Sequence, residues 1–451
     1  MTDKAPEEVK PVTKTNKIPI DKPRVKKQWK NPALRMMGIP RFSLPSRNWM
    51  IFWSVCAGIG GGIWYDKREQ SKIRIKWMEE VKNISEQKYG PDRLPRKLTI
   101  YIAPPPNDFL ESSLKVFRKF VKPVLNASAI DYQIYTENRQ GDIRSAVAQS
   151  VRELRLKKLQ EQKDQEELEA AAIYNKSWTK FFKQIPGYFK PKSAEDEAKL
   201  TSRAELYKPV DVLGLYHLVQ PVDVVSDDED FVNAGGVICI GRGAYKEFMT
   251  GVHEGLLGPL EKPQELIDEE QKLKEEKEQK IQEKLKEGKT FDDDNDEDED
   301  GNKKKDPVTK PYINPEQYGD AKLAPELDWS QVITNDKVPA IFEQPIYVFP
   351  VPNLLGFLKT PEKIYRYYTT RRLADDYGFR TTSIVYNKSR KFLYKDTLMA
   401  KEEELDWPKK WIETGKEKNA EWVKEVEVDE RITSRFRVFD PKLVEQGERK
   451  V

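Results

Sequence analysis

Hydrophobic residues along this 451-residue chain form one uncharged run near the N-terminus and a series of shorter periodic segments after it. The uncharged run covers residues 49–65 (WMIFWSVCAGIGGGIWY). As a helix it is about 25 Å long, near the lower limit for crossing a bilayer. Its Trp and Tyr residues lie toward the two ends, where amphipathic rings favour the membrane interface. We therefore predict a transmembrane helix over residues 48–65, with a buried core helix as the alternative.

An amphipathic segment follows the uncharged run directly. Residues 66–96 carry apolar side chains at helical spacing among many charges: Ile73, Ile75, Trp77, Met78 and Val81. This pattern predicts a linker helix. A cleavable secretory signal is the competing interpretation of the uncharged run. Because the run begins nearly fifty residues into the chain and continues as a helix, a retained anchor is favoured.

The charges on the two sides of the uncharged run predict its orientation. Residues 1–47 form a basic tail with twelve Lys and Arg against four Asp and Glu, a net charge of +8. Residues 66–97 carry ten against six, a net charge of +4. Since the more positive flank stays on the side from which insertion occurs, the N-terminus should remain inside and the large domain should be exported.

Small residues within the run predict a contact with another helix. Gly58 and Gly62 are four residues apart, and Ala57 and Gly61 form a second small pair on the same side of the helix. Small side chains allow the backbone of a second membrane helix to approach closely. Glycine is also common in membrane helices without such a contact, so both interpretations stay open.

From residue 97 the pattern changes to alternating strands and helices. Strands are predicted at 98–103, 130–135 and 234–240, and helices at 107–126, from Gly141 onward, and at 244–257. Strand, helix, strand, helix with short links is typical of a parallel sheet. We therefore predict an α/β domain over residues 97–260, interrupted by a charged and aromatic insertion at 156–232. The aromatic part, 175–210, is interpreted either as a membrane or partner surface or as a loop packed on its own core.

Two further regions complete the chain. Residues 261–322 predict a charged helix and a disordered acidic loop, since eight of the nine residues 292–300 are acidic. Residues 323–451 predict a smaller α+β part. It contains a strand at 346–351, a helix that begins at Thr360-Pro361 and ends at Gly378, and a strand at 380–386.

Composition removes several classes of function. With 37% hydrophobic and 34% charged residues, the chain cannot be a multi-span membrane protein. The 79 basic and 76 acidic groups nearly cancel, which argues against a nucleic-acid binder. The cysteines, Cys56 and Cys239, and the histidines, His217 and His253, form no cluster. A zinc site, a disulfide and a His-based catalytic set are therefore disfavoured, and no cofactor is predicted.

Three sequence blocks resemble a known family. They are residues 38–49 (GIPRFSLPSRNW), 235–243 (GGVICIGRG) and 351–357 (VPNLLGF). In order and spacing they are similar to the 54-kilodalton subunit family of the mitochondrial carrier translocase. The resemblance implies an inner-membrane protein whose large domain lies in the intermembrane space. It also implies three kinds of partner: a channel-forming subunit, small intermembrane-space chaperones, and carrier precursors. Asp3, Glu7 and Glu8 agree with the lack of an acid-poor transit peptide.

A second resemblance concerns the segment 240–251. It is similar to the G-G-D-G-T-x-x-E-x-x-x-G phosphate loop of diacylglycerol-type lipid kinases. The matching residues are Gly241, Gly243, Glu247 and Gly251, and the replaced ones are Ile240, Arg242 and Ala244. A cationic Arg242 in place of the family's Asp cannot bind Mg²⁺, so phosphoryl transfer is disfavoured. Contact of Arg242 with an anion remains open.

These observations favour a membrane-tethered, non-catalytic scaffold that assists insertion of multi-span proteins. A membrane-bound lipid kinase is the main alternative, and an anchored structural protein of another organelle is the third.

Overall fold

The computed structural model describes residues 46–87, 96–106, 109–137, 139–176, 235–269, 310–335, 338–354, 356–417 and 420–444, together with 271, 272 and 275. The chain separates into two units, Met1–Ile63 and Trp64–Val451, and each is considered by itself. The aromatic segment 175–210 lies outside the described residues from residue 177 onward, as does the acidic stretch 292–300.

In the first unit, the uncharged run is helical, as predicted. It forms the beginning of α2, which extends over Arg47–Ser85. Its large side chains are exposed, including Trp49 and Trp53 at 55% and 59%. However, none of the described helices is both long and apolar enough to cross a membrane. The crossing by residues 48–65 stays a prediction.

The second unit is built on a six-stranded sheet with the order β2-β1-β3-β6-β8-β7. All neighbouring strands are parallel except β7, which is antiparallel to β8 at one edge. The strands of this sheet are β1 Lys97–Ile102, β2 Asp131–Thr136, β3 Val237–Ile240, β6 Pro345–Phe349, β7 Ser389–Lys391 and β8 Arg437–Phe439. A separate short ribbon pairs β4 Thr334–Asn335 with β5 Val338–Pro339. The predicted α/β class with a mainly parallel sheet is confirmed.

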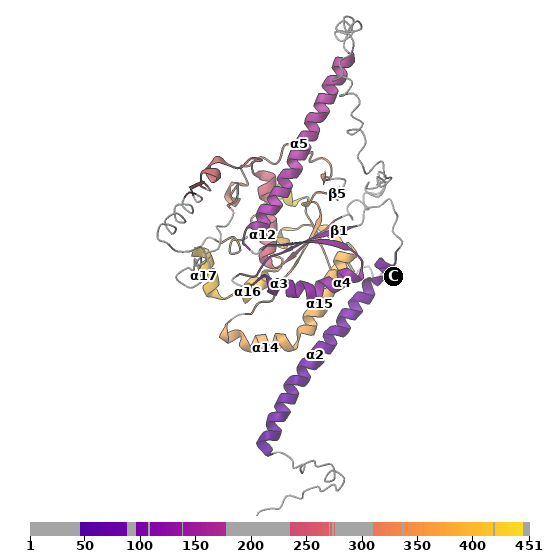
Figure 1. Cartoon of the computed structure of the whole chain (residues 1–451), viewed down its shortest axis with the longest axis vertical. Coiled ribbons are helices and arrows are strands. Elements are labelled where there is room, and N and C mark those ends of the chain that lie inside the picture. Colours follow the sequence, from indigo (N-terminus) through magenta and orange to yellow (C-terminus); the bar gives the residue numbers. More distant parts are fainter. Residues whose placement is uncertain are drawn as a thin grey trace, which may run out of the picture. The chain divides into compact units, whose positions relative to one another are not determined.

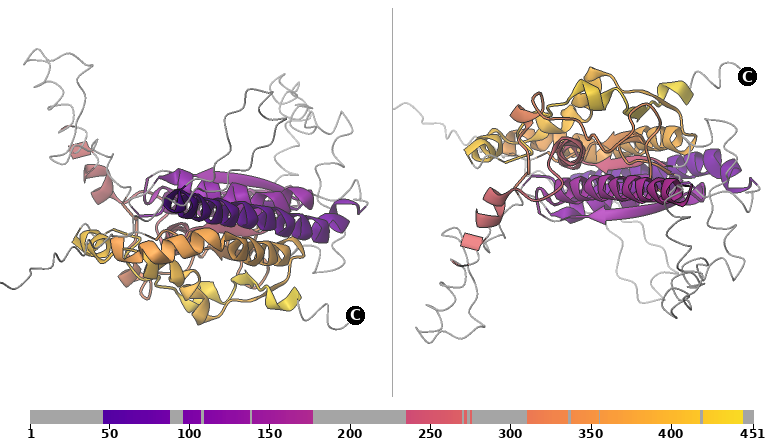
Figure 2. Two further views of the ribbon diagram at one scale, coloured as in Figure 1. Left: turned by 90° about the horizontal axis from the view of Figure 1, so that it is seen from below. Right: turned by 90° about the horizontal axis from the view of Figure 1, so that it is seen from above.

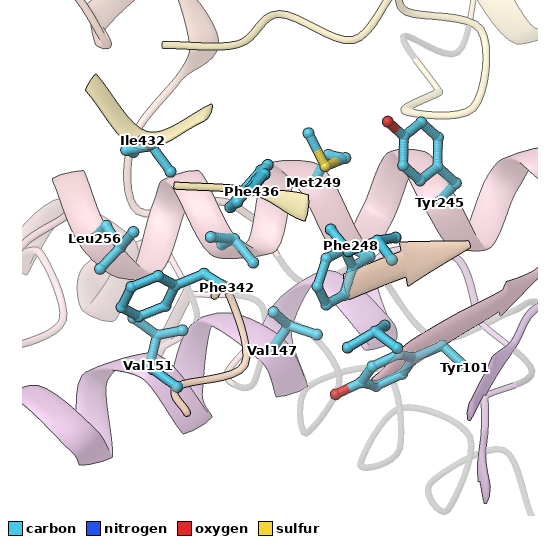
Figure 3. Packing of buried hydrophobic residues seen from close by; sticks show 14 of the residues in the cluster. Tyr101, Val147, Val151, Tyr245, Phe248, Met249, Leu256, Phe342, Ile432 and Phe436 are labelled. Carbon is cyan, nitrogen blue, oxygen red and sulfur yellow. The ribbon is translucent and has the colours of Figure 1, made fainter. Parts of the chain in front are cut away.

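Helices cover both faces of the sheet (Figures 1 and 2). On one face, α5 Asp142–Lys176 and α12 Arg242–Leu257 run side by side. They enclose a core with Tyr101 from β1 and Phe248 from α12, and Val147 and Val151 contribute from α5 (Figure 3). In the outer part of α5, residues 157–167 are mostly exposed and charged, as predicted.

The opposite face is covered by helices from three parts of the chain. The first part consists of α3 Leu110–Val116, the π-helical turn η1 Phe117–Val121 and α4 Lys122–Ala127. The second is α15 Thr370–Val385, and the third is the end of α2, which contributes Val81 and Trp77. Within residues 66–85, predicted as a linker helix, Val81 is thus buried in this core, and Ile73, Trp77 and Ile84 pack against it.

Shorter helices lie in the connections of the second unit. They are η4 Pro315–Gln317, η5 Phe357–Lys359, α14 Thr360–Tyr368, η6 Tyr394–Leu398, α16 Lys401–Asp406, α17 Lys409–Glu417 and α18 Glu430–Thr433.

Two predictions in the C-terminal part are wrong. The helix that begins at Thr360 breaks at Thr369, and the next helix, α15, continues past Gly378 to Val385. Residues 380–386, predicted as a strand, are therefore helical up to Val385. The physical reason is tertiary: a Cβ atom at Gly378 would lie 2.1 Å from Cδ1 of Trp77, so the glycine permits close packing of α2 instead of ending the helix.

Candidate functional site at the loop after strand β3

The position of this loop in the sheet makes it the natural place to search for a ligand site. The five parallel strands lie side by side in the order β2-β1-β3-β6-β8. Counted by their order in the chain, this is 2-1-3-4-5, a doubly wound arrangement. In such sheets, ligands bind beyond the carboxyl ends of the strands where the strand order reverses, which here is between β1 and β3. The segment that resembles a phosphate loop follows β3 directly.

The backbone of the loop has the form expected of a glycine turn. Gly241 has a φ of +95°, a conformation that side chains of L-residues rarely adopt. Its N–H donates to the carbonyl oxygen of Phe349 on the neighbouring strand at 2.8 Å. Helix α12 begins at the next residue, Arg242, so the turn directs a helix N-terminus toward the sheet edge.

A carboxylate of the chain itself occupies this helix N-terminus. Oε2 of Glu403 accepts hydrogen bonds from the backbone N–H of Arg242 at 2.8 Å and from that of Val351 at 3.0 Å. Glu403 is 2% exposed. Free N–H groups and the helix dipole make such an N-terminus an anion site, and here the anion comes from α16. Burial raises the pKa of Glu403 to about 7, although these two hydrogen bonds and the Arg242 charge favour the ionised form.

The guanidinium of Arg242 is engaged by the same segment. Its Nη1 donates to the carbonyl oxygens of Thr397 at 2.6 Å and Met399 at 2.8 Å, and its Nε donates to Oε1 of Glu404 at 2.9 Å. Nζ of Lys246 also lies 2.7 Å from Oε1 of Glu404. Arg242 is 2% exposed and binds the connection before α16, so the anions it meets are the chain's own carboxylates.

The other matched residues lie along α12, where Glu247 and Gly251 contribute to packing against α5. Glu247 is buried and accepts from the N–H of Ile143 at 3.2 Å. Burial raises its pKa to about 8. A Cβ atom at Gly251 would lie 2.7 Å from the carbonyl oxygen of Arg144, so this glycine allows α5 to approach closely. Gly243 has no neighbouring atom within 4 Å of such a position.

A cavity of about 860 Å³ lies beside α12, in the size range of small-molecule pockets. Its charged lining is largely neutralised internally. Glu254 forms ion pairs with Arg144 and, at 2.5 Å, with Arg152, and Arg144 also bonds Glu421 at 2.9 Å. Most of the buried charge beside this cavity is thus paired, whereas Oε2 of Glu421 is buried without a hydrogen-bond partner in the described residues.

Cys239 and His253 are both buried. Cys239 is fully buried, and burial raises the pKa of its thiol. His253 faces the carbonyl oxygen of Met249 through Nδ1 and accepts from the N–H of Asp429 through Nε2. Burial lowers its pKa to about 4. Within these residues, no cluster of three His, Cys, Asp or Glu side chains is placed to hold a metal.

The small residues predicted to contact another helix belong to the first unit. Ala57, Gly58 and Gly61 are exposed, and Gly62 is half-buried. A Cβ atom at Gly58 or Gly61 would meet nothing within 4 Å. The space beside these glycines is therefore open in the described residues.

Glu403 is the important residue that the sequence did not reveal. It is the middle one of three consecutive glutamates, and 161 positions separate it from its partner Arg242. No spacing or motif distinguishes it from Glu402 or Glu404, so only the fold identifies it.

Comparison with known proteins supplies the family. Residues 31–439 match the family described as "Inner membrane protein import complex subunit Tim54". A relative from Candida albicans is 58% identical, over 92% of this chain and 98% of its own length. Another from Debaryomyces hansenii is 53% identical, over 94% and 93%, and one from Saccharomyces cerevisiae is 38% identical, over 95% and 98%. All three are named "Mitochondrial import inner membrane translocase subunit TIM54". With nearly the whole length matched, this chain belongs to the family of the inner membrane protein import complex subunit Tim54.

Proposed function

We propose that this chain is a non-catalytic scaffold subunit of the mitochondrial inner-membrane import translocase, and that it assists insertion of multi-span proteins. The names of its relatives support membership in this translocase and a location at the mitochondrial inner membrane. The observation that carries the non-catalytic part is the closed loop after β3. Glu403 takes the hydrogen bonds that a phosphate would need, and Arg242 stands where a kinase needs a metal-binding carboxylate.

The mechanism that we propose is tethering. A docking domain held beside the channel-forming subunit converts delivery of a carrier precursor into a nearly intramolecular step, which raises its effective concentration. The small chaperones of the intermembrane space are the proposed source of the precursor. This choice of partners follows from the family resemblance. With it, we propose that the second unit lies on the intermembrane-space side.

Attachment to the inner membrane is assigned to the beginning of α2. The exposed side chains of Trp49, Phe52 and Trp53 give this helix the aromatic and apolar surface that favours a bilayer interface. Protease treatment of mitochondria with an opened outer membrane tests the side. Cleavage of the second unit supports the intermembrane-space location, and full protection contradicts it. Under the same conditions, cleavage within residues 1–45 would indicate that α2 lies on the membrane surface. Protection of these residues would indicate that α2 passes through the membrane.

The assembly is tested by isolating the native complex through this chain in mild detergent and identifying its companions by mass spectrometry. We expect the channel-forming subunit and the small chaperones. Gly58→Leu with Gly62→Leu should weaken recovery of the channel subunit if the small residues contact it. The matched control is Ile51→Leu with Ile59→Leu, which leaves the small residues in place. Recovery of the chain alone would contradict the proposal.

The lipid-kinase alternative is tested separately. The purified chain is incubated with labelled ATP, Mg²⁺ and diacylglycerol vesicles, beside an Arg242→Asp variant that restores the motif carboxylate. We expect no labelled lipid from either protein, because Glu403 still fills the helix N-terminus. Transfer by the unmodified chain would overturn the non-catalytic assignment without affecting membership in the complex.

A further inference from the structure

Helix α14 turns its apolar side chains outward. Ile364, Tyr365 and Tyr367 are 53%, 55% and 55% exposed, and the helix has no buried residue. A surface helix of a soluble domain ordinarily packs its apolar face on the core. In Figure 1, α14 lies at the edge of the second unit and leads into α15.

One polar side chain of α14 joins the helix to the rest of the second unit. Nη1 of Arg366 donates to Oδ2 of Asp406 at 2.7 Å, and its Nη2 donates to Oε1 of Glu362 at 2.7 Å. Asp406 is only 7% exposed. This charge-assisted contact links α14 to Asp406 at the end of α16 while the apolar side chains of α14 stay exposed.

The exposed apolar surface continues into the turn before α14. Phe357 and Leu358, in η5, are 90% and 92% exposed. Nζ of Lys359 donates to the carbonyl oxygen of Leu405, whose side chain is 75% exposed. Apolar side chains of this size and number in one place mark an interaction surface.

Basic residues accompany this surface. Residues 357–372 contain five Lys and Arg against one Glu, a net charge of +4. Lys363 and Arg372 are exposed, on α14 and at the start of α15. Tyrosine and phenylalanine with flanking Lys and Arg are typical of helices that lie in the interface of an anionic bilayer.

The surface also adjoins α2 at the beginning of the second unit. The backbone N–H of Arg371 donates to Oδ1 of Asp66 at 3.2 Å, and its guanidinium lies 5.4 Å from the ring centroid of Tyr65. Trp64 and Tyr65 are 63% and 52% exposed. The junction of α14 and α15 therefore lies beside Tyr65, the last residue of the uncharged run.

We propose that α14 and η5 lie on the anionic phospholipid surface of the membrane to which α2 attaches, and so hold the second unit against the bilayer. The proposal builds on the membrane attachment proposed above. A bilayer accounts for three observations together: the outward apolar face, the net positive charge and the position beside Tyr65. An acidic protein partner would account for the first two, but it would not require the position beside Tyr65.

The test measures the depth of single positions in the full chain. A Cys56→Ser chain receives Leu358→Cys or Tyr365→Cys, is labelled with a small environment-sensitive fluorophore and is reconstituted into vesicles that carry a lipid-attached quencher. The vesicles are neutral or contain anionic phosphatidylglycerol. The control is Val332→Cys, which is 50% exposed and directly precedes Ile333 of the core around Phe248. We expect quenching at 358 and 365 in anionic vesicles, and none at 332.

Charge reversal tests the electrostatic part. Lys363→Glu with Arg372→Glu should lower the membrane-bound fraction of α14 by about tenfold or more, since each basic residue near an anionic surface contributes severalfold. Lys163→Glu with Lys391→Glu makes the same charge change on α5 and β7 and should have no effect. Quenching at 358 and 365 no greater than at 332, or equal in neutral vesicles, overturns the proposal.

A photo-crosslinker at position 365 in intact mitochondria gives the second readout. Lipid adducts support the bilayer assignment. Adducts to another subunit or to a second copy overturn it. Recovery of the complex by detergent isolation does not depend on either result, so failure here is distinguishable from failure of the scaffold assignment.

Discussion

At the scale of single residues, Glu403 stabilises the loop after β3 by satisfying backbone groups that would otherwise be buried and unpaired. Glu403→Ala removes the acceptor for two N–H groups and a negative charge beside Arg242, so we expect a loss of roughly 3 kcal/mol in the free energy of unfolding. Urea denaturation followed by circular dichroism measures it.

Two further variants make this expectation specific. Glu403→Gln keeps an acceptor oxygen and should lose less than half as much. Glu402→Ala changes an exposed neighbour and should stay within about 0.5 kcal/mol of the unmodified chain. Sulfate should restore part of the stability of Glu403→Ala, because the vacated helix N-terminus is an anion site. If sulfate stabilises the unmodified chain equally, Glu403 does not occupy that site.

Glu247 predicts how stability depends on pH. Its pKa is about 8 in the folded chain against an ordinary value of 4.5. Between these values the folded chain holds a proton that the unfolded chain has released. The contribution of Glu247 is therefore fully present below pH 4.5 and is lost as the pH rises toward 8. Relative to Glu247→Gln, the unmodified chain should lose roughly 3 kcal/mol between pH 5 and pH 8.

Unfolding free energies of both chains at several pH values test this directly. Glu111→Gln, on the exposed surface of α3, is the matched control and should follow the unmodified chain at every pH. A Glu247→Gln curve that also runs parallel to the unmodified chain would mean that Glu247 is ionised in the folded protein at neutral pH.

At the scale of elements, the contact between α2 and α15 depends on a glycine. Gly378→Ala places a Cβ atom against Trp77, so we expect a loss of about 2 kcal/mol although alanine favours a helix by about 1 kcal/mol. Because Trp77→Ala removes the obstacle, the double variant should be more stable than the sum of the single losses indicates. Gly243→Ala, with open space, should be neutral or slightly stabilising. Additive losses would show that the two residues do not meet.

The same contact explains which elements could be predicted from the sequence. Apolar runs such as KLTIYI (β1) and VICI (β3) identify parallel strands because they are buried on both faces and local pattern is sufficient. The role of Gly378 is ambiguous from the local sequence, since a glycine can end a helix or permit close packing of another helix. Trp77, about 300 positions away, decides between them. The candidate site shows the same difference between local and distant information. The motif identifies Gly241 from the sequence, whereas only the fold identifies Glu403.

At the scale of the whole molecule, the boundary between the two units lies inside one helix. The sequence suggested boundaries at residues 65 and 96, where composition changes. Packing instead places Trp64–Ser85 with the second unit, because Val81 and Trp77 belong to its core and Asp66 accepts from Arg371. Composition indicates whether a segment is suited to water or to lipid, whereas a folding unit is defined by its contacts. In α2 these two criteria give different boundaries.

This boundary predicts the outcome of two truncations. A chain that begins at Trp64 keeps these contacts and should unfold at the temperature of the second unit in the full chain. A chain that begins at residue 88 loses the burial of Val81 and Trp77, the bond from Trp77 Nε1 to Asp375 and the bond from the Tyr386 hydroxyl to the carbonyl of Glu80. We expect it to lose about 4 kcal/mol or more, which is much of the stability of an ordinary domain. Calorimetry of both chains measures the difference. Equal unfolding temperatures would show that the end of α2 does not stabilise the second unit. Residues 66–96 would then be a linker, as composition suggested.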